Sequence, residues 1–449
     1  MKNFTLTNTL TGKKEAVIID SEKPFKMYVC GITPYDNPHI GHGRVYIVFD
    51  VIYRMLQFCD INTTYCRNFT DIDDKLLNRA EKEYNNPMRY TEIATHYINV
   101  FENNMKKLNC IKPTIEPRVT ENIPVIIDFI QGLIEKGRAY VVDQDVYFSI
   151  QSFPEYGKLS KRNLDDMLVG ARVSVNEKKR NPLDFALWKS EPEGTFWKSP
   201  WGYGRPGWHI ECSALAAHYL GKSIDLHGGG MDLIFPHHEN EIAQSEGLTE
   251  MPFARIWVHN AFVRIHEEKM SKSLGNFITL DAIFQKYDPM ILRFFILQHH
   301  YRNPLDFSYE ELDRQHKTYQ KLCLWFEKTK TDTSDALKSY ENLHPIAQEC
   351  LNFIADDLNI SGLFGTIFKN SDTISNDNCL KKQIKTLLVE LLGLSLVPLE
   401  EKEFIITDEI QKLIDARNQA RLNKDWKTAD ELRQQLKELG YEARDEKLK

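Results

Sequence analysis

The pattern of apolar and polar residues in the first part of the chain predicts an alternating α/β fold. Residues 25–29 alternate in the manner of a short strand and run into a loop that contains Gly31. Apolar residues then recur at three- and four-residue steps, which predicts a helix over 43–58, and residues 63–69 predict the next strand. A strand, a glycine-containing loop and a helix in this order open a nucleotide-binding α/β unit.

The pattern changes further along the chain. Residues 115–205 are rich in proline, glycine and tryptophan and are predicted to be an insertion between two halves of the sheet. Residues 224–227 resemble a late strand that ends in a tight loop at Gly228–Gly230. From about residue 309 the strand signals end and long amphipathic helices follow, the last of them in the very polar segment 406–449.

Composition is that of a globular protein without a membrane segment. The chain has 449 residues, 42% of them hydrophobic and 27% charged, and no stretch reaches the roughly 18 consecutive apolar residues of a membrane span. The first twenty residues lack the apolar run of a signal peptide, so we expect a cytoplasmic protein. The eight cysteines are scattered without a Cys-x-x-Cys pair, so a metal site has to draw its ligands from distant segments. With a net charge of −7, local basic patches have to meet any polyanionic partner.

Residues His39-Ile40-Gly41-His42 form the first candidate site. They lie where the first loop meets the first predicted helix, and a helix N-terminus offers N–H groups and partial positive charge to a phosphate. Two imidazoles there can hydrogen-bond a phosphate whose charge grows in a transition state, and Gly41 lets a flat adenine approach the backbone. Four such residues also occur together by chance, so this motif alone does not decide the function.

A second motif, Lys269-Met270-Ser271-Lys272-Ser273, makes a chance match of the first motif less probable. Lys269 and Lys272 lie three residues apart in a loop that is able to hold a pyrophosphate leaving group, although such a loop alone is usually a solvated turn. Together and in this order, the two motifs are the signatures of the class I aminoacyl-tRNA synthetases, which the chain therefore resembles. The resemblance implies activation of an amino acid with ATP, and Mg²⁺ bound with the ATP.

Five residues from three segments form a candidate metal site. Cys30 ends the first predicted strand, Cys212 precedes the late strand, and His237, His238 and Glu241 crowd the start of a later helix. His237 and Glu241 are four residues apart and share one helical face. Two thiolates, one imidazole and one carboxylate suit Zn²⁺. Free cysteines are also commonly small buried hydrophobes, and His238 is an alternative ligand to His237.

The segments around these residues resemble the cysteinyl-tRNA synthetase family over nearly the whole chain. In that family zinc binds the thiolate of the substrate cysteine, and the resemblance implies the ligands Cys30, Cys212, His237 and Glu241. It also implies two steps, formation of cysteinyl-adenylate and pyrophosphate and then transfer of cysteine to the terminal ribose of tRNA(Cys). The resemblance is carried by residues 28–31, 35–36, 39–42, 68–75, 182–185, 199–202, 204–213, 225–230 and 235–244.

The resemblance further implies a role for individual side chains, each of which also has an ordinary structural interpretation. The groups that stabilise the phosphates are expected to be His39, His42, Lys269 and Lys272. The amino acid is expected to be framed by Thr33, Thr70 and Trp208 and the adenosine by Gly229 and Asp232, with Gly31 and His227 completing the substrate site.

The expected fold is a Rossmann-type class I synthetase catalytic domain with an insertion, followed by an α-helical bundle and a small C-terminal tRNA-binding domain. The expected regions are 1–114 (first catalytic half), 115–205 (connective insertion), 206–260 (second catalytic half with the zinc ligands), 261–308 (stem-contact region with the lysine motif), 309–404 (helical bundle) and 405–449 (anticodon-binding region).

The last region is expected to contact the tRNA. Arg417, Arg421 and Lys424 follow one another at steps of four and three residues, which predicts a basic stripe on one helical face that can meet phosphates. Nearby acidic residues also fit a solvated, salt-bridged face. The chain stops after 446–449, where members of the family usually continue, which predicts a reduced anticodon-reading surface.

Two other functions fit part of the pattern. A related ligase that joins cysteine to an amino-sugar would keep the zinc and ATP sites, but it would lack the helical tail that begins near residue 309. A non-catalytic, zinc-stabilised RNA-binding protein would have lost the ATP motifs, which are intact in this chain. We therefore expect a monomeric enzyme whose partners are tRNA(Cys), ATP and L-cysteine, with no membrane partner.

Overall fold

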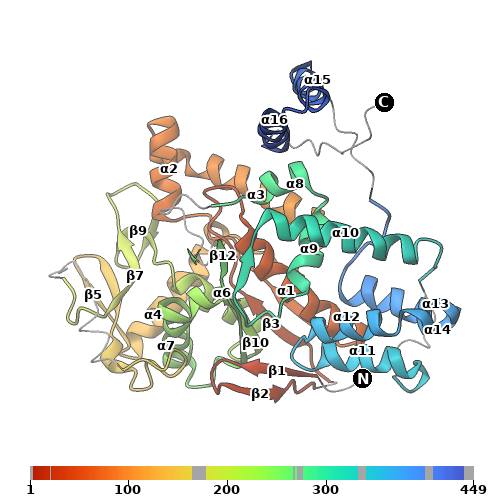
Figure 1. The fold of residues 1–449 in the computed structure, drawn as a ribbon. Coiled ribbons are helices and arrows are strands. Elements are labelled where there is room, and N and C mark those ends of the chain that lie inside the picture. The colour runs from red at the N-terminus through yellow and green to blue at the C-terminus, as the bar shows by residue number, and fades with distance from the viewer. Residues whose placement is uncertain are drawn as a thin grey trace. The chain divides into compact units, whose positions relative to one another are not determined.

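The protein is described by a computed structural model that covers residues 4–20, 22–163, 178–265, 268–269, 277–331, 340–399 and 408–438 (Figure 1). The chain divides into two compact units, residues 1–397 (unit 1) and residues 398–449 (unit 2). Among the described helices, none is long and apolar enough to cross a membrane.

Four parallel strands form the sheet at the centre of unit 1, in the order β11-β10-β3-β4. The register pairs Tyr28 of β3 with Cys66 on one side and with His227 on the other. β4 is added on one side of β3 and β10 on the other, so the strand order reverses between β3 and β10, and ligands bind outside the carboxyl ends of the strands at such a switch point. The bounds are β3 Phe25–Val29, β4 Thr63–Cys66, β10 Ile224–Gly230 and β11 Ala254–Asn260.

Three helices pack around this sheet. α1 (Ile40–Phe58) joins β3 to β4 and packs on β10 and β11, whereas α6 (Ile210–Leu220) packs on β3 and β4 and α7 (Glu239–Thr249) lies against α6. α1 is the helix that the apolar spacing predicts, but it is buried on all sides, since every residue from Tyr46 to Leu56 is buried. Residues four apart fall on one face of a helix. On that face Ile47, Val51 and Met55 are completely buried.

α1 begins before its predicted start because two histidines cap its first turn. The backbone N–H of His42 donates to Nδ1 of His39 over 3.4 Å, and the N–H of His39 donates to Nδ1 of His42 over 3.2 Å. Imidazoles thus satisfy backbone N–H groups that a helix start otherwise leaves unpaired.

A second, antiparallel sheet is inserted between β4 and β10, in the order β5-β6-β7-β9-β8. Its strands β5, β7 and β9 lie on the opposite side of unit 1 from helices α11 to α14 (Figure 1). The bounds in this part are α2 Asp74–Tyr84, α3 Tyr90–Lys107, α4 Ile123–Glu135, β5 Ala139–Val142, β6 Asp145–Phe148, β7 Phe185–Ser190, β8 Trp197–Ser199 and β9 Gly202–Pro206.

Two small sheets and a set of helices complete the fold. Within the described residues no strand follows β14, in agreement with the helical pattern from residue 309. The remaining bounds are β1 Thr5–Asn8, β2 Lys13–Ala16, β12 Val263–Ile265, β13 Glu268–Lys269, β14 Leu305–Phe307, α8 Leu280–Lys286, α9 Pro289–Leu297, α10 Tyr309–Phe326, α11 Pro345–Ala355, α12 Ile360–Lys369, α13 Ser371–Asn376, α14 Asn378–Thr386 and, in unit 2, α15 Asp408–Leu422 and α16 Trp426–Glu438.

Two predicted strand ends are wrong. β10 does not turn at its glycines but continues to Gly230, because parallel pairing with β11 extends to Gly230 and Asn260. β4 ends at Cys66 instead of residue 69, and Phe69 forms only isolated bridges, with Ile32 and with Arg118.

Candidate active site

A cavity of about 330 Å³ opens at the carboxyl ends of β3 and β10. Its walls come from the loop after β3, the start of α1, the end of β10 and the segment 260–263. It lies at the switch point of the parallel sheet, where the topology predicts a ligand site. The predicted site residues that line it are Cys30, Gly31, Thr33, His39, His42, Thr70, Trp208, Cys212, Gly229, Asp232 and His237.

The two histidines of the first motif share one wall of the cavity. Their rings stack with centroids 3.7 Å apart and an interplanar angle of 24°. Phe277 meets the His39 ring edge-on, with centroids 5.0 Å apart. The helix cap and this stacking hold both rings at the start of α1, where the helix dipole favours a phosphate.

Next to the histidines, four buried side chains converge from the loop after β3, from α6, from the turn before α7 and from α7. The Sγ atoms of Cys30 and Cys212 are 3.6 Å apart, and Sγ of Cys30 is 3.3 Å from Oε1 of Glu241. Nε2 of His237 lies 3.2 Å from the same oxygen. One ligand atom from each of the four residues fits within 4.8 Å of all the others, so this group can hold a metal ion.

A second grouping shares Cys30 and Glu241 but uses His227 and His238, and its ligand atoms also lie within 4.8 Å of one another. Nε2 of His238 is 3.3 Å from Sγ of Cys30. Nε2 of His227 is 2.7 Å from Oε2 of Glu241, which is a hydrogen-bond distance. Both histidines that the sequence offered as ligands, His237 and His238, therefore lie within reach of the cluster.

Burial sets the protonation of this cluster. It lowers the pKa of His237 and of His238 well below the ordinary value, and neighbouring histidines lower both further. Neutral imidazole is the form that binds metals. Burial raises the pKa of the Cys30 thiol, with Cys212 and Glu241 adding to the effect, so a metal ion has to displace its proton.

A further shell of side chains, which the sequence did not indicate, orients the histidines. Nδ1 of His237 lies 2.9 Å from Nδ1 of His209, and Nδ1 of His238 lies 2.7 Å from Nε2 of His259. Metal-binding histidines generally use their second nitrogen in this way. The sequence held no signal for His259, which lies opposite Gly229 only because β10 pairs with β11.

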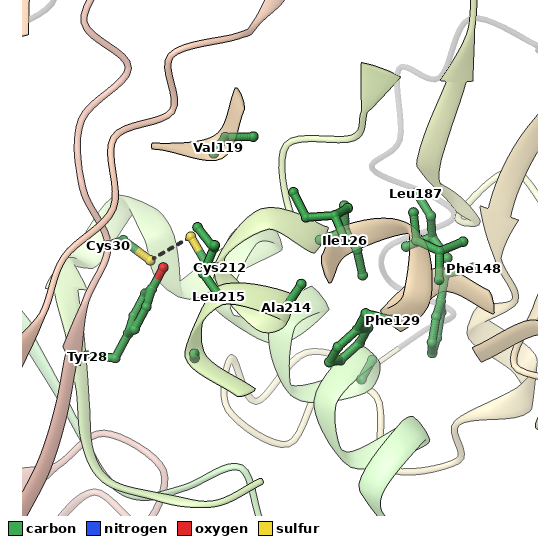
Figure 2. Close-up of a cluster of buried hydrophobic side chains, with 14 of the residues drawn as sticks. Tyr28, Cys30, Val119, Ile126, Phe129, Phe148, Leu187, Cys212, Ala214 and Leu215 are labelled. Atoms are coloured by element: carbon green, nitrogen blue, oxygen red, sulfur yellow. Dashed lines mark hydrogen bonds between the residues drawn. The ribbon is translucent and has the colours of Figure 1, made fainter. Parts of the chain in front are cut away.

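Tyr28 joins the cluster to the hydrophobic core, and its hydroxyl lies beside the Cys30–Cys212 contact in Figure 2. That hydroxyl donates to Oδ1 of Asn68 over 3.1 Å, and the N–H of Gly31 donates to the same oxygen over 3.0 Å. A Cβ at Gly31 would lie 1.5 Å from the Asn68 carbonyl oxygen, so this position requires glycine.

Thr70 lines the cavity and hydrogen-bonds to polar side chains inside the protein. Its hydroxyl donates to Oε2 of Glu211 over 2.7 Å and accepts from the side-chain amide of Asn68 over 3.2 Å. Glu211 is buried, and this burial raises its pKa. Trp208 closes the cavity on another side, with its ring 4.5 Å from the ring of His237. Neither Glu211 nor Asn68 was singled out from the sequence.

One predicted substrate contact has a different position. His227 is completely buried, does not line the cavity, and stacks on Trp257 with centroids 4.4 Å apart. The structure therefore places His227 behind Glu241, and contact with the substrate stays a prediction.

The lysine motif is described only in part. Lys269 lies in β13, where its backbone pairs with Arg264 of β12, and Lys272 lies outside the described residues.

The predicted basic stripe belongs to unit 2 and is not evenly exposed. Arg417 is buried, Arg421 is half-buried and Lys424 is exposed. Lys424 has a positive φ of 59° and lies in the turn between α15 and α16, so helical spacing does not extend to it. The end of the chain, for which a reduced anticodon-reading surface is predicted, lies outside the described residues.

Comparison with known proteins assigns the fold to a class. The model of the class I (C) tRNA synthetase catalytic domain matches residues 17–317. Methionyl-tRNA synthetase of Mycobacterium tuberculosis, solved with methionyl-adenylate, is 14% identical with a TM-score of 0.58, covering 87% of this chain and 94% of that chain. A putative arginyl-tRNA synthetase of Campylobacter jejuni is 13% identical with a TM-score of 0.53, covering 85% and 94%. These likenesses show the fold, which is that of a class I aminoacyl-tRNA synthetase.

Sequence relatives define the family within that class. The cysteine–tRNA ligase of Trichlorobacter lovleyi is 46% identical over 96% of this chain and 95% of that protein. The cysteine–tRNA ligase of Caldicellulosiruptor saccharolyticus is 46% identical over 97% and 96%. The model of the cysteinyl-tRNA ligase anticodon binding domain matches residues 406–449. The chain belongs to the cysteine–tRNA ligase family.

Proposed function

We propose that the chain activates L-cysteine with ATP and transfers it to the 3′-terminal adenosine of tRNA(Cys), with one zinc ion selecting the cysteine thiolate. The observation that carries this proposal is that a histidine pair and a candidate metal cluster lie next to each other at one cavity. The capped histidine pair lies on one wall, and the cluster of Cys30, Cys212, His237 and Glu241 lies beside it. Family membership supports the overall reaction, and the cluster supplies the reason why cysteine is the amino acid.

The distances in the cluster fit zinc. A tetrahedral Zn²⁺ with ligand bonds of about 2.0–2.3 Å has ligand atoms roughly 3.3–3.8 Å apart. The contacts of 3.6 Å between the two sulfur atoms and 3.3 Å from Cys30 to Glu241 fall in that range. The contact of 3.2 Å from His237 to Glu241 lies at its edge. The donor set of two thiolates, one imidazole and one carboxylate is also one that zinc prefers.

The same distances favour His237 over the alternative grouping. The separation of 2.7 Å between His227 and Glu241 is too short for two ligands of one ion and is that of a hydrogen bond. His237 also lines the cavity that receives the substrate, whereas His238 does not. We assign His227 to orienting Glu241 instead of contacting the substrate.

Zinc at this cluster would supply a Lewis acid that accepts the thiolate of L-cysteine but offers little to the hydroxyl of serine. A purely hydrophobic pocket separates near-isosteres by only about 10²-fold. The four ligand residues therefore give selectivity that makes a separate editing domain unnecessary. Gly31, Thr33, Thr70 and Trp208 would hold the rest of the amino acid, since all four line the cavity.

Adenylate formation needs no covalent enzyme intermediate. The carboxylate of L-cysteine attacks the α-phosphorus of ATP, a new P–O bond forms, and the bond to pyrophosphate breaks. His39 and His42 would stabilise the phosphate charge from the start of α1, with Lys269 and Lys272 acting on the pyrophosphate and Mg²⁺ accompanying the ATP. Gly229 and Asp232 line the cavity and would contact the adenosine.

In the second step a hydroxyl of the terminal ribose attacks the cysteinyl carbonyl, and AMP leaves. The anticodon-domain match over 406–449 supports tRNA as the acceptor. We propose that Arg421 and Lys424 contact tRNA phosphates there. Arg417 is buried and would contribute less to phosphate binding. We also propose a division of the chain into a catalytic part, 1–308, a helical part, 309–404, and a tRNA-binding part, 405–449. The catalytic-domain match over 17–317 supports the first part and the anticodon-domain match over 406–449 supports the last.

Amino-acid-dependent ATP–pyrophosphate exchange across the twenty amino acids tests activation. We expect exchange with L-cysteine alone, and exchange that does not depend on cysteine would overturn the proposal. Charging of total tRNA then tests the acceptor. Exchange without charging would favour an amino-sugar as acceptor.

Substitution of the cluster tests the metal. Wild-type protein should contain about one zinc per chain by elemental analysis, and Cys212→Ser should lose both zinc and affinity for L-cysteine. Cys66→Ser, another buried cysteine on the neighbouring strand that belongs to neither metal grouping, is the matched control and should keep its zinc. Retention of zinc and of cysteine affinity by Cys212→Ser would refute the site.

A further inference from the structure

Arg44 lies two residues after His42 in α1 and is almost completely buried, with 1% of its surface exposed. Its guanidinium group donates to five backbone carbonyl oxygens over distances of 2.5 to 3.2 Å. Nη1 donates to the carbonyls of Ala261 and Phe262, and Nη2 donates to those of His300, Tyr301 and Asn303.

These carbonyls belong to two segments that run side by side into parallel strands. Phe262 directly precedes β12, and Asn303 lies two residues before β14. The N–H of Ala261 donates to the carbonyl of Tyr301 over 2.8 Å, and the N–H of Leu305 donates to that of Phe262 over 3.0 Å. Arg44 thus bonds to the point where both strands begin.

One of these segments belongs to the active site. Ala261, Phe262 and Val263 line the cavity. Strand β12 begins at Val263 and pairs with β13, which carries Lys269, through the register of Arg264 with Lys269. Arg44 therefore connects the histidine-capped start of α1 to the base of the hairpin that leads into the lysine motif.

The contacts of Arg44 differ from those of an ordinary ion pair. Within the described residues no carboxylate lies within ion-pair distance of Arg44, so its charge is balanced by carbonyl dipoles. Burial lowers the pKa of Arg44 to about 10, which still leaves it protonated at neutral pH. Lysine cannot replace this arrangement, because its ammonium offers three donors from one point whereas the planar guanidinium offers a fixed fork.

We propose that Arg44 is a positioning residue for adenylate formation, which holds the start of α1 and the β12–β13 hairpin in one fixed arrangement. The inference rests on the proposed phosphate contacts of His42 and Lys269. A displacement of about 1 Å between reacting groups costs on the order of 10²-fold in rate, so a loosened link lowers kcat. The amino-acid side of the cavity, which Arg44 does not contact, keeps its geometry.

The test compares Arg44→Lys and Arg44→Met with Arg54→Lys. Arg54 lies further along α1, is also buried, and donates to Asp50 and to two backbone carbonyls, so Arg54→Lys matches the loss of packing and hydrogen bonds away from the cavity. Exchange kinetics are measured for each variant per folded, metal-loaded site, together with the thermal unfolding midpoint.

Arg44→Lys is expected to lower kcat of exchange by about 10²-fold while KM for L-cysteine and zinc content stay at their wild-type values. Arg44→Met is expected to lower kcat of exchange further than Arg44→Lys does. Arg54→Lys is expected to lose thermal stability to a similar degree but to keep kcat. Arg44→Lys with wild-type kcat, or equal loss of kcat in Arg44→Lys and Arg54→Lys, would overturn the inference. Failure of the proposed function is distinguishable, because wild-type protein would then itself lack cysteine-dependent exchange.

Discussion

Oε2 of Glu241 lies 2.7 Å from Nε2 of His227, and both residues are completely buried. The other carboxylate oxygen, Oε1, faces Sγ of Cys30 at 3.3 Å and Nε2 of His237 at 3.2 Å. The histidine thereby fixes which oxygen of Glu241 turns toward the proposed metal. Such an outer contact increases metal affinity, because the carboxylate ligand does not have to be ordered when the metal binds.

Replacing His227 with alanine should weaken metal binding without removing a ligand. Loss of an outer partner typically costs about 10–100-fold in metal affinity. We expect that decrease for zinc, measured by competition with a chromogenic chelator. His218→Ala, an exposed histidine on α6, is the control and should bind zinc like the wild type. Unchanged affinity in His227→Ala would assign this histidine to packing against Trp257 alone.

Zinc affinity should fall steeply as pH falls, since two thiols have to lose their protons. Burial raises the pKa of the Cys30 thiol, so below neutrality the proton competes strongly with the metal. Burial also lowers the pKa of His237, which is therefore neutral over the same range and releases no proton on binding. We expect apparent zinc affinity to change by about 10²-fold per pH unit below the thiol pKa values.

The slope of that pH dependence identifies the ligands. Competition titrations at several pH values should give a slope of two for the wild-type protein. Any residual zinc binding by Cys212→Ser should give a slope of one, because the serine hydroxyl keeps its proton. A wild-type slope of one would mean that only one thiolate binds the metal, as in the grouping of Cys30 with His227, His238 and Glu241.

Thr70→Val should separate the amino-acid pocket from the metal. Valine keeps the shape of the side chain but removes the hydroxyl that bonds to Glu211 and Asn68. Buried groups left without a partner cost about 1–3 kcal/mol of folding stability, so the thermal unfolding midpoint should fall. Thr70 also lines the cavity, and loss of a hydrogen bond to the amino acid worth about 0.5–1.5 kcal/mol should raise KM for L-cysteine by about 2- to 12-fold. Zinc content should not change. Thr63→Val at the start of β4 should leave KM at its wild-type value, and a KM for Thr70→Val equal to that value would exclude Thr70 from the pocket.

The local pattern was sufficient to predict the strand–loop–helix start of the nucleotide unit and the helical character of the chain after residue 309. Strand ends were less predictable, since pairing with a neighbour decides them. β10 continues through three glycines only because β11 lies beside it, and no local propensity favours glycine in a strand.

Some residues of the candidate site were predictable from the sequence and others were not. Cys30, Cys212 and Glu241 were indicated by residue chemistry and family resemblance, and the structure brings them together. His209 and His259 were not, because their partners lie in other elements and no sequence spacing links them. His227 was indicated as a site residue, but its depth behind Glu241 depends on packing across β10 and α7, which the sequence pattern does not contain.

Asp50→Asn should destabilise unit 1 strongly, because Asp50 balances two buried arginines. Its Oδ2 accepts from Nε of Arg54 over 2.7 Å and from Nη2 of Arg293, and its Oδ1 accepts from the N–H of Ile111. Arg293 is completely buried, and removal of one partner of a buried ion pair costs about 3–5 kcal/mol. The denaturation midpoint should therefore fall well below that of Glu92→Gln, which breaks only an exposed pair with Arg89.

A double replacement gives this prediction its sharper form. Arg293→Met removes the guanidinium that Asp50→Asn leaves uncompensated, so the double variant should be more stable than the sum of the two single losses indicates. Arg293 also donates to the carbonyls of Leu392 and Leu108, and those two acceptors stay unpaired in the double variant. We therefore expect partial recovery and not wild-type stability. Strictly additive losses would mean that the backbone carbonyls, and not Asp50, compensate the charge of Arg293.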